Sequence, residues 1–146
     1  MRLILDTNVF ISGIFFSGPP YEILNAWRHR KVALVISPDI LDEYRRVAEQ
    51  LAKRYPGVNL EPFLDLLAIK ARIVEAPPLD ESVCSDPDDD KFIACALASR
   101  TKLICSGDKA LLRASGYRGI TILRPKDFVD SYLKAKSQQG HSVGGV

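Results

Sequence analysis

The sequence MRLILDTN, residues 1–8, decides the fold that we expect for this chain. Leu3 to Leu5 form an unbroken apolar run, which is typical of a strand buried on both faces of a parallel sheet. The run stops at Asp6, and in open α/β sheets the ligand binds in the crevice beyond the carboxyl ends of the strands. Asp6 is therefore a candidate for such a site, although an aspartate in this position also commonly caps a turn.

The rest of the chain alternates between strand-like and helix-like segments. Apolar strand patterns cover 2–6, 32–36, 72–75, 102–105 and 119–123. A loop containing Gly13 and Gly18 is expected before the helical spacing begins, and that spacing covers 21–31, 37–55, 63–68, 90–100, 108–114 and 125–136. This alternation predicts an α/β fold with a parallel sheet and right-handed crossovers. We expect one domain over 1–136 and a disordered tail over 137–146, where there is little to bury.

The composition is that of an ordinary globular protein. The 146 residues are 47% hydrophobic and 26% charged, and the net charge is +2. No apolar run reaches the roughly 20 residues that a membrane helix needs, and the chain enters its first strand without a signal peptide, so we expect a cytoplasmic protein with no membrane partner. The three cysteines form no C-x-x-C pair, which indicates reduced, buried thiols and not a zinc site. The small net charge leaves room for a local basic patch.

Three further acidic residues stand where strands end or helices begin. In the helix after the second strand, Glu43 lies on the border of the apolar stripe, so it can lean over the sheet edge or remain an exposed surface charge. Asp90 has helical spacing to Ile93 and Leu97, which predicts that it faces the core. Asp108 directly follows the fourth strand, where it can also cap the next helix.

Four acids, far apart in the sequence, are thus expected to converge on one crevice: Asp6, Glu43, Asp90 and Asp108. Crowded carboxylates repel one another unless cations lie between them. Hard oxygen ligands, with no Cys or His nearby, select Mg²⁺ or Mn²⁺ over zinc. Neither His29, in a basic helix end, nor His141, in the tail, is placed to act as a base. We therefore expect metal-activated water, for which phosphodiester hydrolysis is the natural chemistry.

Four short motifs follow one another along the chain. They are Leu5-Asp6-Thr7-Asn8-Val9, Ser37-Pro38 followed by Glu43, Asp86-Pro87-Asp88-Asp89-Asp90-Lys91-Phe92-Ile93-Ala94, and Ser106-Gly107-Asp108. Each motif alone is weak, but the four in this order are specific. Together they resemble the PIN-domain nucleases, and most of all the branch of toxin components of toxin–antitoxin systems, with a match from residue 1 to about 130.

The resemblance implies a three-layer α/β/α fold with a five-stranded parallel sheet in the order 3-2-1-4-5. It also implies a Mg²⁺- or Mn²⁺-dependent endoribonuclease that cleaves single-stranded RNA, with a metal-binding quartet of Asp6, Glu43, Asp90 and Asp108. Asn8 and Ser106 would support these ligands by hydrogen bonds, and Asp88 would be an outer ligand. PIN toxins are typically homodimers held by an antitoxin protein, whereas other relatives of this fold process RNA without one.

An RNA substrate also needs cations beside the acidic centre. Lys109 and Arg113 are the preferred candidates, because they follow Asp108 on a helix beside the proposed crevice, although each can equally be a solvated surface charge. The main rival enzyme is a phosphatase of the haloacid-dehalogenase type, but the second acid of its Asp-x-Asp pair is replaced here by Asn8. The non-enzymatic alternative is a PIN fold that serves only as a binding module.

Overall fold

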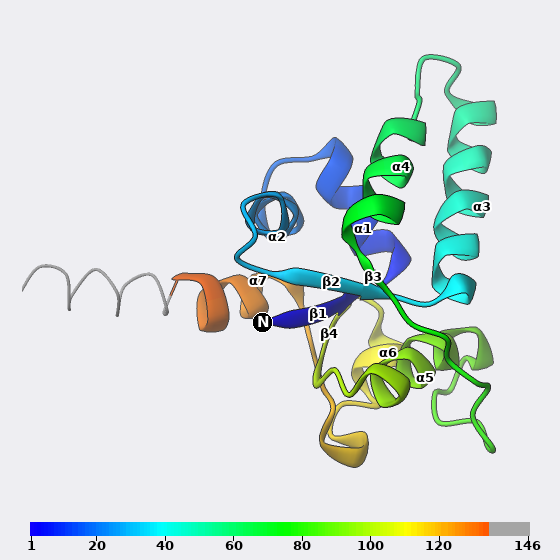
Figure 1. Cartoon of the computed structure of the whole chain (residues 1–146), viewed down its shortest axis with the longest axis vertical. Helices are drawn as coiled ribbons and strands as arrows, with labels where there is room; N and C mark the ends of the chain where they lie inside the picture. The colour runs from blue at the N-terminus through cyan, green and yellow to red at the C-terminus, as the bar shows by residue number, and fades with distance from the viewer. Residues whose placement is uncertain (135–146) are drawn as a thin grey trace, which may run out of the picture.

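A parallel sheet forms the centre of the molecule. The computed structural model describes residues 1–134 and contains a five-stranded sheet in the order β3-β2-β1-β4-β5, in which every neighbouring pair is parallel (Figure 1). The fold class and strand order predicted from the sequence are therefore confirmed. The strands are β1 (Arg2–Leu5), β2 (Ala33–Ile36), β3 (Arg72–Ile73), β4 (Leu103–Cys105) and β5 (Thr121–Leu123).

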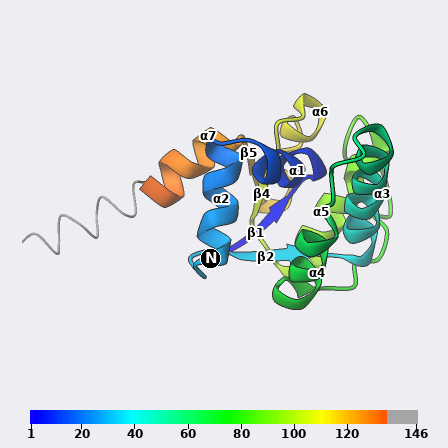
Figure 2. The ribbon, with the colours of Figure 1, turned by 90° about the horizontal axis from the view of Figure 1, so that it is seen from above.

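Helices cover both faces of this sheet. Figure 1 shows α1 to α4 on one side of the sheet and α5 and α6 on the other, and Figure 2 shows α7 beside α2. The helices are α1 (Thr7–Phe15), α2 (Pro19–Arg28), α3 (Pro38–Arg54), α4 (Glu61–Lys70), α5 (Asp90–Ser99), α6 (Lys109–Leu112) and α7 (Pro125–Phe128). A π-helical segment, Val129–Lys134, continues α7. None of the helices within residues 1–134 is both long and apolar enough to cross a membrane.

The central strand is buried on both faces, as its uninterrupted apolar sequence predicts. Leu3, Ile4 and Leu5 are at most 1% exposed. Helix α5 packs on the sheet from one face, and its small residues Ala94 and Ala96 allow a close approach. All three cysteines are buried and free, which agrees with the interpretation of reduced thiols.

The register of the strands aligns their carboxyl ends. Leu5 lies opposite Cys105 in the β1–β4 pair. The pairing continues one step further, because the N–H of Asp6 donates to the carbonyl of Cys105 at 3.0 Å and the N–H of Ser106 donates to the carbonyl of Leu123 at 3.0 Å. The residues that follow β1 and β4 are consequently fixed side by side at one edge of the sheet.

The largest departure from the sequence-based expectation is helix α1, which occupies much of the segment expected as a loop. Gly13 lies inside this helix, where it permits a close approach to α2: a Cβ at this position would lie 2.7 Å from Leu24 Cδ1. The helix-breaking tendency of glycine was therefore a misleading signal, because here glycine serves helix packing. The tail predicted over 137–146 lies outside the described residues.

Candidate functional site

An acidic pocket of about 340 Å³ lies at the carboxyl edge of the sheet. Helices α3 and α5, which are in contact, contribute to its walls together with the segments that follow β1 and β4. We use the name acidic pocket for the space lined by five carboxylates, namely Asp6, Glu43, Asp88, Asp89 and Asp108.

Asp6 is the most buried carboxylate of the pocket, at 5% exposure. One oxygen, Oδ1, accepts from the N–H of Val9 at 3.0 Å and so caps helix α1. The other, Oδ2, accepts from the hydroxyl of Ser106. Burial raises the pKa of Asp6 although these two bonds oppose the rise, and the nearby charges of Asp108 and Glu43 raise it further. The capping role and a role in the site are thus compatible in one side chain.

Glu43 projects from α3 toward the same pocket. Its Oε2 accepts from the hydroxyl of Thr7, and its Oε1 forms an ion pair of 2.7 Å with Lys91 Nζ on α5. The adjacent residue Tyr44 is fully buried and donates its hydroxyl to the carbonyl of Leu5. These contacts connect α3 to β1 and α5 and place Glu43 over the sheet edge, not in open solvent.

Asp108 closes the pocket from the β4 side. It caps α6, since Oδ1 accepts from the N–H of Ala110 at 3.1 Å. Its own N–H donates to Ser106 Oγ at 2.9 Å, and Ser106 in turn donates to Asp6. Ser106 is fully buried. A single hydroxyl therefore connects the segments that carry two of the acids.

Asp89 is the acid of the Asp86–Asp90 run that faces the buried part of the pocket. It ends a 3-10 turn, Pro87–Asp89, immediately before α5. Burial, together with the hydrogen bond and the charge of the neighbouring Asp108 carboxyl, raises the pKa of Asp89 to about 7. Its Oδ2 is buried and has no hydrogen-bond partner among the described residues. The carboxyl groups of Asp89 and Asp108 can hydrogen-bond to each other only if one of them carries a proton. When both are ionised, the buried Oδ2 of Asp89 therefore has no partner among the described residues.

Asp90, which the sequence analysis placed among the metal ligands, does not line the acidic pocket. Its carboxylate turns back over the preceding loop, where it accepts from Cys84 N–H at 2.8 Å, Val83 N–H at 3.2 Å and Ser82 Oγ at 2.8 Å. Partial burial alone would raise the pKa of Asp90, but these hydrogen bonds hold it below the ordinary value.

Helical spacing predicted that Asp90 faces the core, and the direction of its Cα–Cβ bond explains why its carboxylate lies elsewhere. Side chains tilt toward the helix N-terminus, so an acid at the first helical position reaches back to the loop that precedes the helix. Of the four acids predicted to converge, Asp6, Glu43 and Asp108 line the pocket, and Asp89 lines it where Asp90 does not.

The other residues singled out from the sequence divide into two groups. Asn8 and Asp88 are exposed residues of the acidic pocket. Lys109 and Arg113 are exposed on and after α6 and are not among the residues that line it. The cation that does line the pocket is Arg46, on α3 one turn after Glu43.

The donor set of the pocket suits a hard divalent cation. Carboxylate oxygens are the ligands that Mg²⁺ and Mn²⁺ prefer, and the buried, unpartnered oxygen of Asp89 is a group that such an ion would satisfy. Within residues 1–134, however, no three acidic, histidine or cysteine side chains are grouped closely enough to hold one ion as they stand. Both oxygens of Glu43 already have partners, Thr7 and Lys91. The donor atoms of the pocket are therefore of the type that such an ion prefers. To coordinate the ion, however, Glu43 would have to give up its bond with Thr7 or with Lys91.

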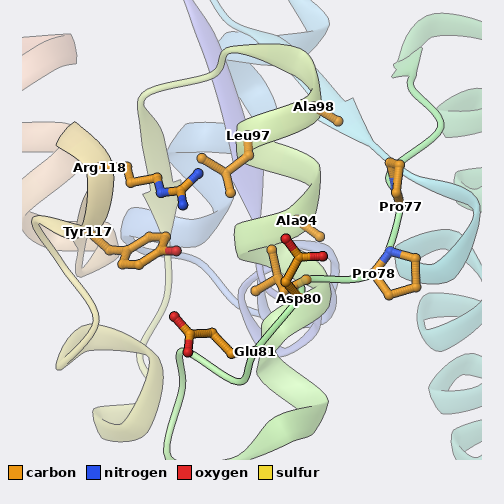
Figure 3. A pocket seen from close by; sticks show the side chains of 10 residues that line it. Pro77, Pro78, Asp80, Glu81, Ala94, Leu97, Ala98, Tyr117 and Arg118 are labelled. Carbon is orange, nitrogen blue, oxygen red and sulfur yellow. The ribbon is translucent and has the colours of Figure 1, made fainter.

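A second hollow of similar size, about 360 Å³, lies on another side of α5. We call it the proline hollow; it is lined by residues 77–81, by Ala94, Leu97 and Ala98 of α5, and by Tyr117 and Arg118. Figure 3 shows Tyr117 and Arg118 reaching in from one side and Pro77 and Pro78 from the other, with Asp80 between them. Its charged residues carry both signs and are exposed, so none of these charges is removed from water as Asp6 is in the acidic pocket.

The sequence and fold define this chain as a PIN domain. The family profile matches residues 2–110, and the chain therefore belongs to the PIN domain family, whose members are typically metal-dependent nucleases.

Among individual proteins, the chain is similar to the uncharacterised protein MJ1680 of Methanocaldococcus jannaschii, with 31% identity over 92% of this chain and 93% of the relative. Its fold is similar to that of PAE2754 from Pyrobaculum aerophilum, with a TM-score of 0.57 and 18% identity, covering 88% of this chain and 87% of the other. FitAcB from Neisseria gonorrhoeae has a TM-score of 0.50 and 18% identity, covering 85% of this chain and 98% of that chain.

Proposed function

We propose that this protein is a Mg²⁺- or Mn²⁺-dependent endoribonuclease that cleaves single-stranded RNA at the acidic pocket. The observation that carries the proposal is the buried Oδ2 of Asp89, which has no partner among the described residues and shares one pocket with Asp6, Glu43 and Asp108. Keeping such carboxylates together has a cost in free energy that a divalent cation would offset. Membership of the PIN domain family supports the nuclease over the phosphatase alternative.

In this proposal Asp6, Glu43, Asp89 and Asp108 would hold the cation. When bound, the ion would supply Lewis-acid chemistry for phosphodiester hydrolysis, including the acidification of water. Ser106 fixes the orientation of Asp6, and Thr7 fixes that of Glu43. Such partners of metal-binding carboxylates set the geometry of the site as much as the ligands do.

The substrate must bring negative phosphates to an acidic pocket, so a cation at its rim is required. Arg46 is exposed and lines the pocket, which makes it our first candidate for a phosphate contact. Lys109 and Arg113 remain candidates for the part of the RNA that extends past Asp108. Asn8 is exposed, so it can contact the RNA near Asp6. A phosphatase of the haloacid-dehalogenase type would need an acid at this position.

The test is incubation of the purified protein with a panel of labelled single-stranded RNAs, duplex RNA and single-stranded DNA. We expect cleavage of single-stranded RNA with Mg²⁺ or Mn²⁺ and none with chelator. A parallel preparation of Asp6→Asn detects contaminating ribonuclease. Cleavage that persists in chelator, or that is equal in the two preparations, would contradict the proposal.

We further propose, from the motif resemblance to the toxin branch, that the protein acts as a homodimeric toxin restrained by an antitoxin protein. Induced expression should then arrest growth. Co-expression of an antitoxin encoded next to this protein should relieve the arrest, and the antitoxin should co-purify with the chain. If expression of the active protein is harmless, a role in RNA processing without an antitoxin is favoured.

A further inference from the structure

Lys91 is the residue of the site whose role neither the motifs nor the proposed mechanism explains. It lies in the first turn of α5, and its Nζ is 2.7 Å from Glu43 Oε1 on α3. The two side chains are only 17% and 20% exposed. The only other ion pair within residues 1–134 joins Lys134 and Asp130 at 3.8 Å, and both of those side chains are largely exposed. The pair at the pocket is therefore short and shielded from water.

This ion pair occupies a carboxylate that the cation would need. Glu43 Oε2 accepts from Thr7 and Oε1 accepts from Lys91, so each of its oxygens has a partner. An ammonium group and a divalent ion on the same carboxylate repel each other. Glu43 can therefore serve the ion fully only after Lys91 has left it.

The surroundings of Lys91 offer the ammonium group a second position. Lys91 also lines an open groove along α3, of about 560 Å³, whose other charged residues are three acids and two arginines: Asp39, Asp42, Glu49, Arg45 and Arg46. Among these acids, the aspartates Asp39 and Asp42 are the second position for the ammonium group. Both aspartates are exposed and neither takes part in an ion pair within the described residues. The four-carbon stem of lysine is flexible, so the charge can move from Glu43 toward these aspartates without movement of the backbone.

We propose that Lys91 is a positioning residue that neutralises Glu43 as an internal counter-cation and is displaced from it when the divalent ion binds. This inference rests on the proposed function, because it assumes a cation in the acidic pocket. It implies that Lys91 lowers the affinity of the pocket for the cation and keeps Glu43 in place until the cation arrives. It also implies that the lysine becomes accessible in the metal-loaded protein.

The first experiment measures Mn²⁺ binding by titration calorimetry without RNA, at fixed pH and ionic strength. Lys91→Met, which keeps the apolar stem and removes the charge, should lower the Kd for Mn²⁺ by roughly three- to tenfold, the range expected when one partly shielded ion pair no longer competes. Lys91→Arg, which keeps the charge, should stay near the parent value. The matched control is Lys53→Met, which removes an exposed lysine charge from the helix that carries Glu43 and should change the Kd much less.

A double-mutant cycle separates competition at Glu43 from a general charge effect. In a Glu43→Gln background, Lys91→Met should improve Mn²⁺ binding no more than Lys53→Met does. An equal gain in both backgrounds would overturn the proposal, as would an unchanged or weaker affinity in Lys91→Met alone.

The second experiment needs no variant, so it remains decisive if Lys91→Met fails to fold. The parent protein is treated with a small amine-acylating reagent with and without Mn²⁺, and the extent of labelling at each lysine is read by mass spectrometry. Labelling at Lys91 should rise at least about twofold when Mn²⁺ displaces it from its buried partner, while Lys53 should not change. Labelling of Lys91 that falls or does not change on adding Mn²⁺ would overturn the proposal.

These measurements also separate this inference from the proposed function. If the parent protein binds Mn²⁺ and Lys91→Met binds it equally well, only the role of Lys91 is wrong. If neither protein binds Mn²⁺, both proposals fail. If Lys91→Met binds Mn²⁺ and the parent protein does not, the result supports the inference that Lys91 competes with the ion for Glu43.

Discussion

The acidic pocket and the proline hollow lie around the same helix, α5, and have nearly the same volume, about 340 Å³ and about 360 Å³. They differ in what surrounds their charges. In the acidic pocket, burial raises the pKa of two carboxyl groups, those of Asp6 and Asp89, and one oxygen of Asp89 has no partner within the described residues. The cation that lines this pocket, Arg46, is exposed. The proline hollow has exposed charges of both signs. A functional site is therefore indicated by desolvated like charges and not by the size of a cavity.

The largest effect is expected from neutralising two adjacent acids, of which Asp89 lines the acidic pocket and Asp90 is bound to the 82–84 loop. Asp89→Asn should reduce RNA cleavage by more than about a hundredfold, because it removes a proposed ligand of the cation. Asp90→Asn should leave cleavage within about threefold of the parent, although losing charged hydrogen bonds to the 82–84 loop should cost about 1–3 kcal/mol of stability. Cleavage assays and thermal melts of both variants check this.

The outcome for these two variants decides between Asp89 and Asp90. If Asp90→Asn abolished cleavage in a folded protein and Asp89→Asn did not, the residue predicted from helical spacing would be the functional one. The carboxylate of Asp90 would then have to leave the 82–84 loop and enter the acidic pocket in the active protein.

A smaller effect is expected for the two serines that donate to Asp6, in the acidic pocket, and to Asp90, outside it. Ser106→Ala removes the hydroxyl that donates to Asp6 and should lower metal affinity and cleavage by about 10- to 100-fold. Ser82→Ala removes the hydroxyl that donates to Asp90 and should cost only about 1 kcal/mol of stability, with little change in cleavage. Mn²⁺ titration and initial cleavage rates distinguish the two. Equal losses of cleavage in both variants would contradict the assignment of Asp6, and not Asp90, to the site.

The pH dependence of stability should also follow from the acidic pocket. The pKa of Asp89 is raised from 3.8 to about 7, so the folded protein binds this proton more tightly than the unfolded chain does. That contribution to stability is present below the unfolded-state pKa and is lost as the pH rises through the folded-state value. Asp6, whose pKa is also raised, acts in the same direction.

Metal-free protein should consequently melt at a lower temperature at about pH 8 than at about pH 5, apart from the effects of other groups. Asp89→Asn should flatten this difference, and saturating Mn²⁺ should restore stability at the higher pH. Thermal melts in chelator and in Mn²⁺ measure both effects. Asp80→Asn, in the proline hollow, is the matched control and should leave the pH profile of the parent unchanged.

The smallest expected effect concerns the arginines of the two regions. Arg46→Ala should weaken binding of single-stranded RNA by a few fold and reduce the slope of log K against log salt by about one, because one phosphate contact is lost. Arg118→Ala, in the proline hollow, should change neither quantity. Binding measured at several salt concentrations in the absence of divalent ions tests this pair. If only Arg118→Ala reduced the slope of log K against log salt, the RNA would be inferred to bind at the proline hollow instead.

The sequence contained most of the fold and part of the site. The buried strand at Leu3–Leu5 and the alternation that follows it were sufficient for the parallel sheet, because both depend on local apolar patterns. Helix α1 was missed because Gly13 breaks the pattern locally, while its use in packing against Leu24 is visible only in three dimensions.

Within the site, the acids at the ends of strands were easier to predict than the others. Asp6 and Asp108 follow directly from strand ends, whose positions the sheet determines. The choice between Asp89 and Asp90 depends on a 3-10 turn of three residues before α5, and a turn of that length leaves no periodic signal. Lys91 was missed for another reason: its partner Glu43 is 48 positions away, and pairing across two helices has no trace in a single sequence.

The hydrogen bond from the Tyr44 hydroxyl to the Leu5 carbonyl has a consequence for how the acidic pocket responds to substitutions elsewhere in the protein. Leu5 directly precedes Asp6, and Tyr44 directly follows Glu43, so the bond lies next to both acids in the chain. The ring of Tyr44 also stacks on Phe10, with centroids 4.5 Å apart. The interior packing thus sets the positions of Asp6 and Glu43 relative to each other, without a bound ion. Substitutions deep in the protein that shift this tyrosine would therefore change the distance between the two acids in molecules that are still folded.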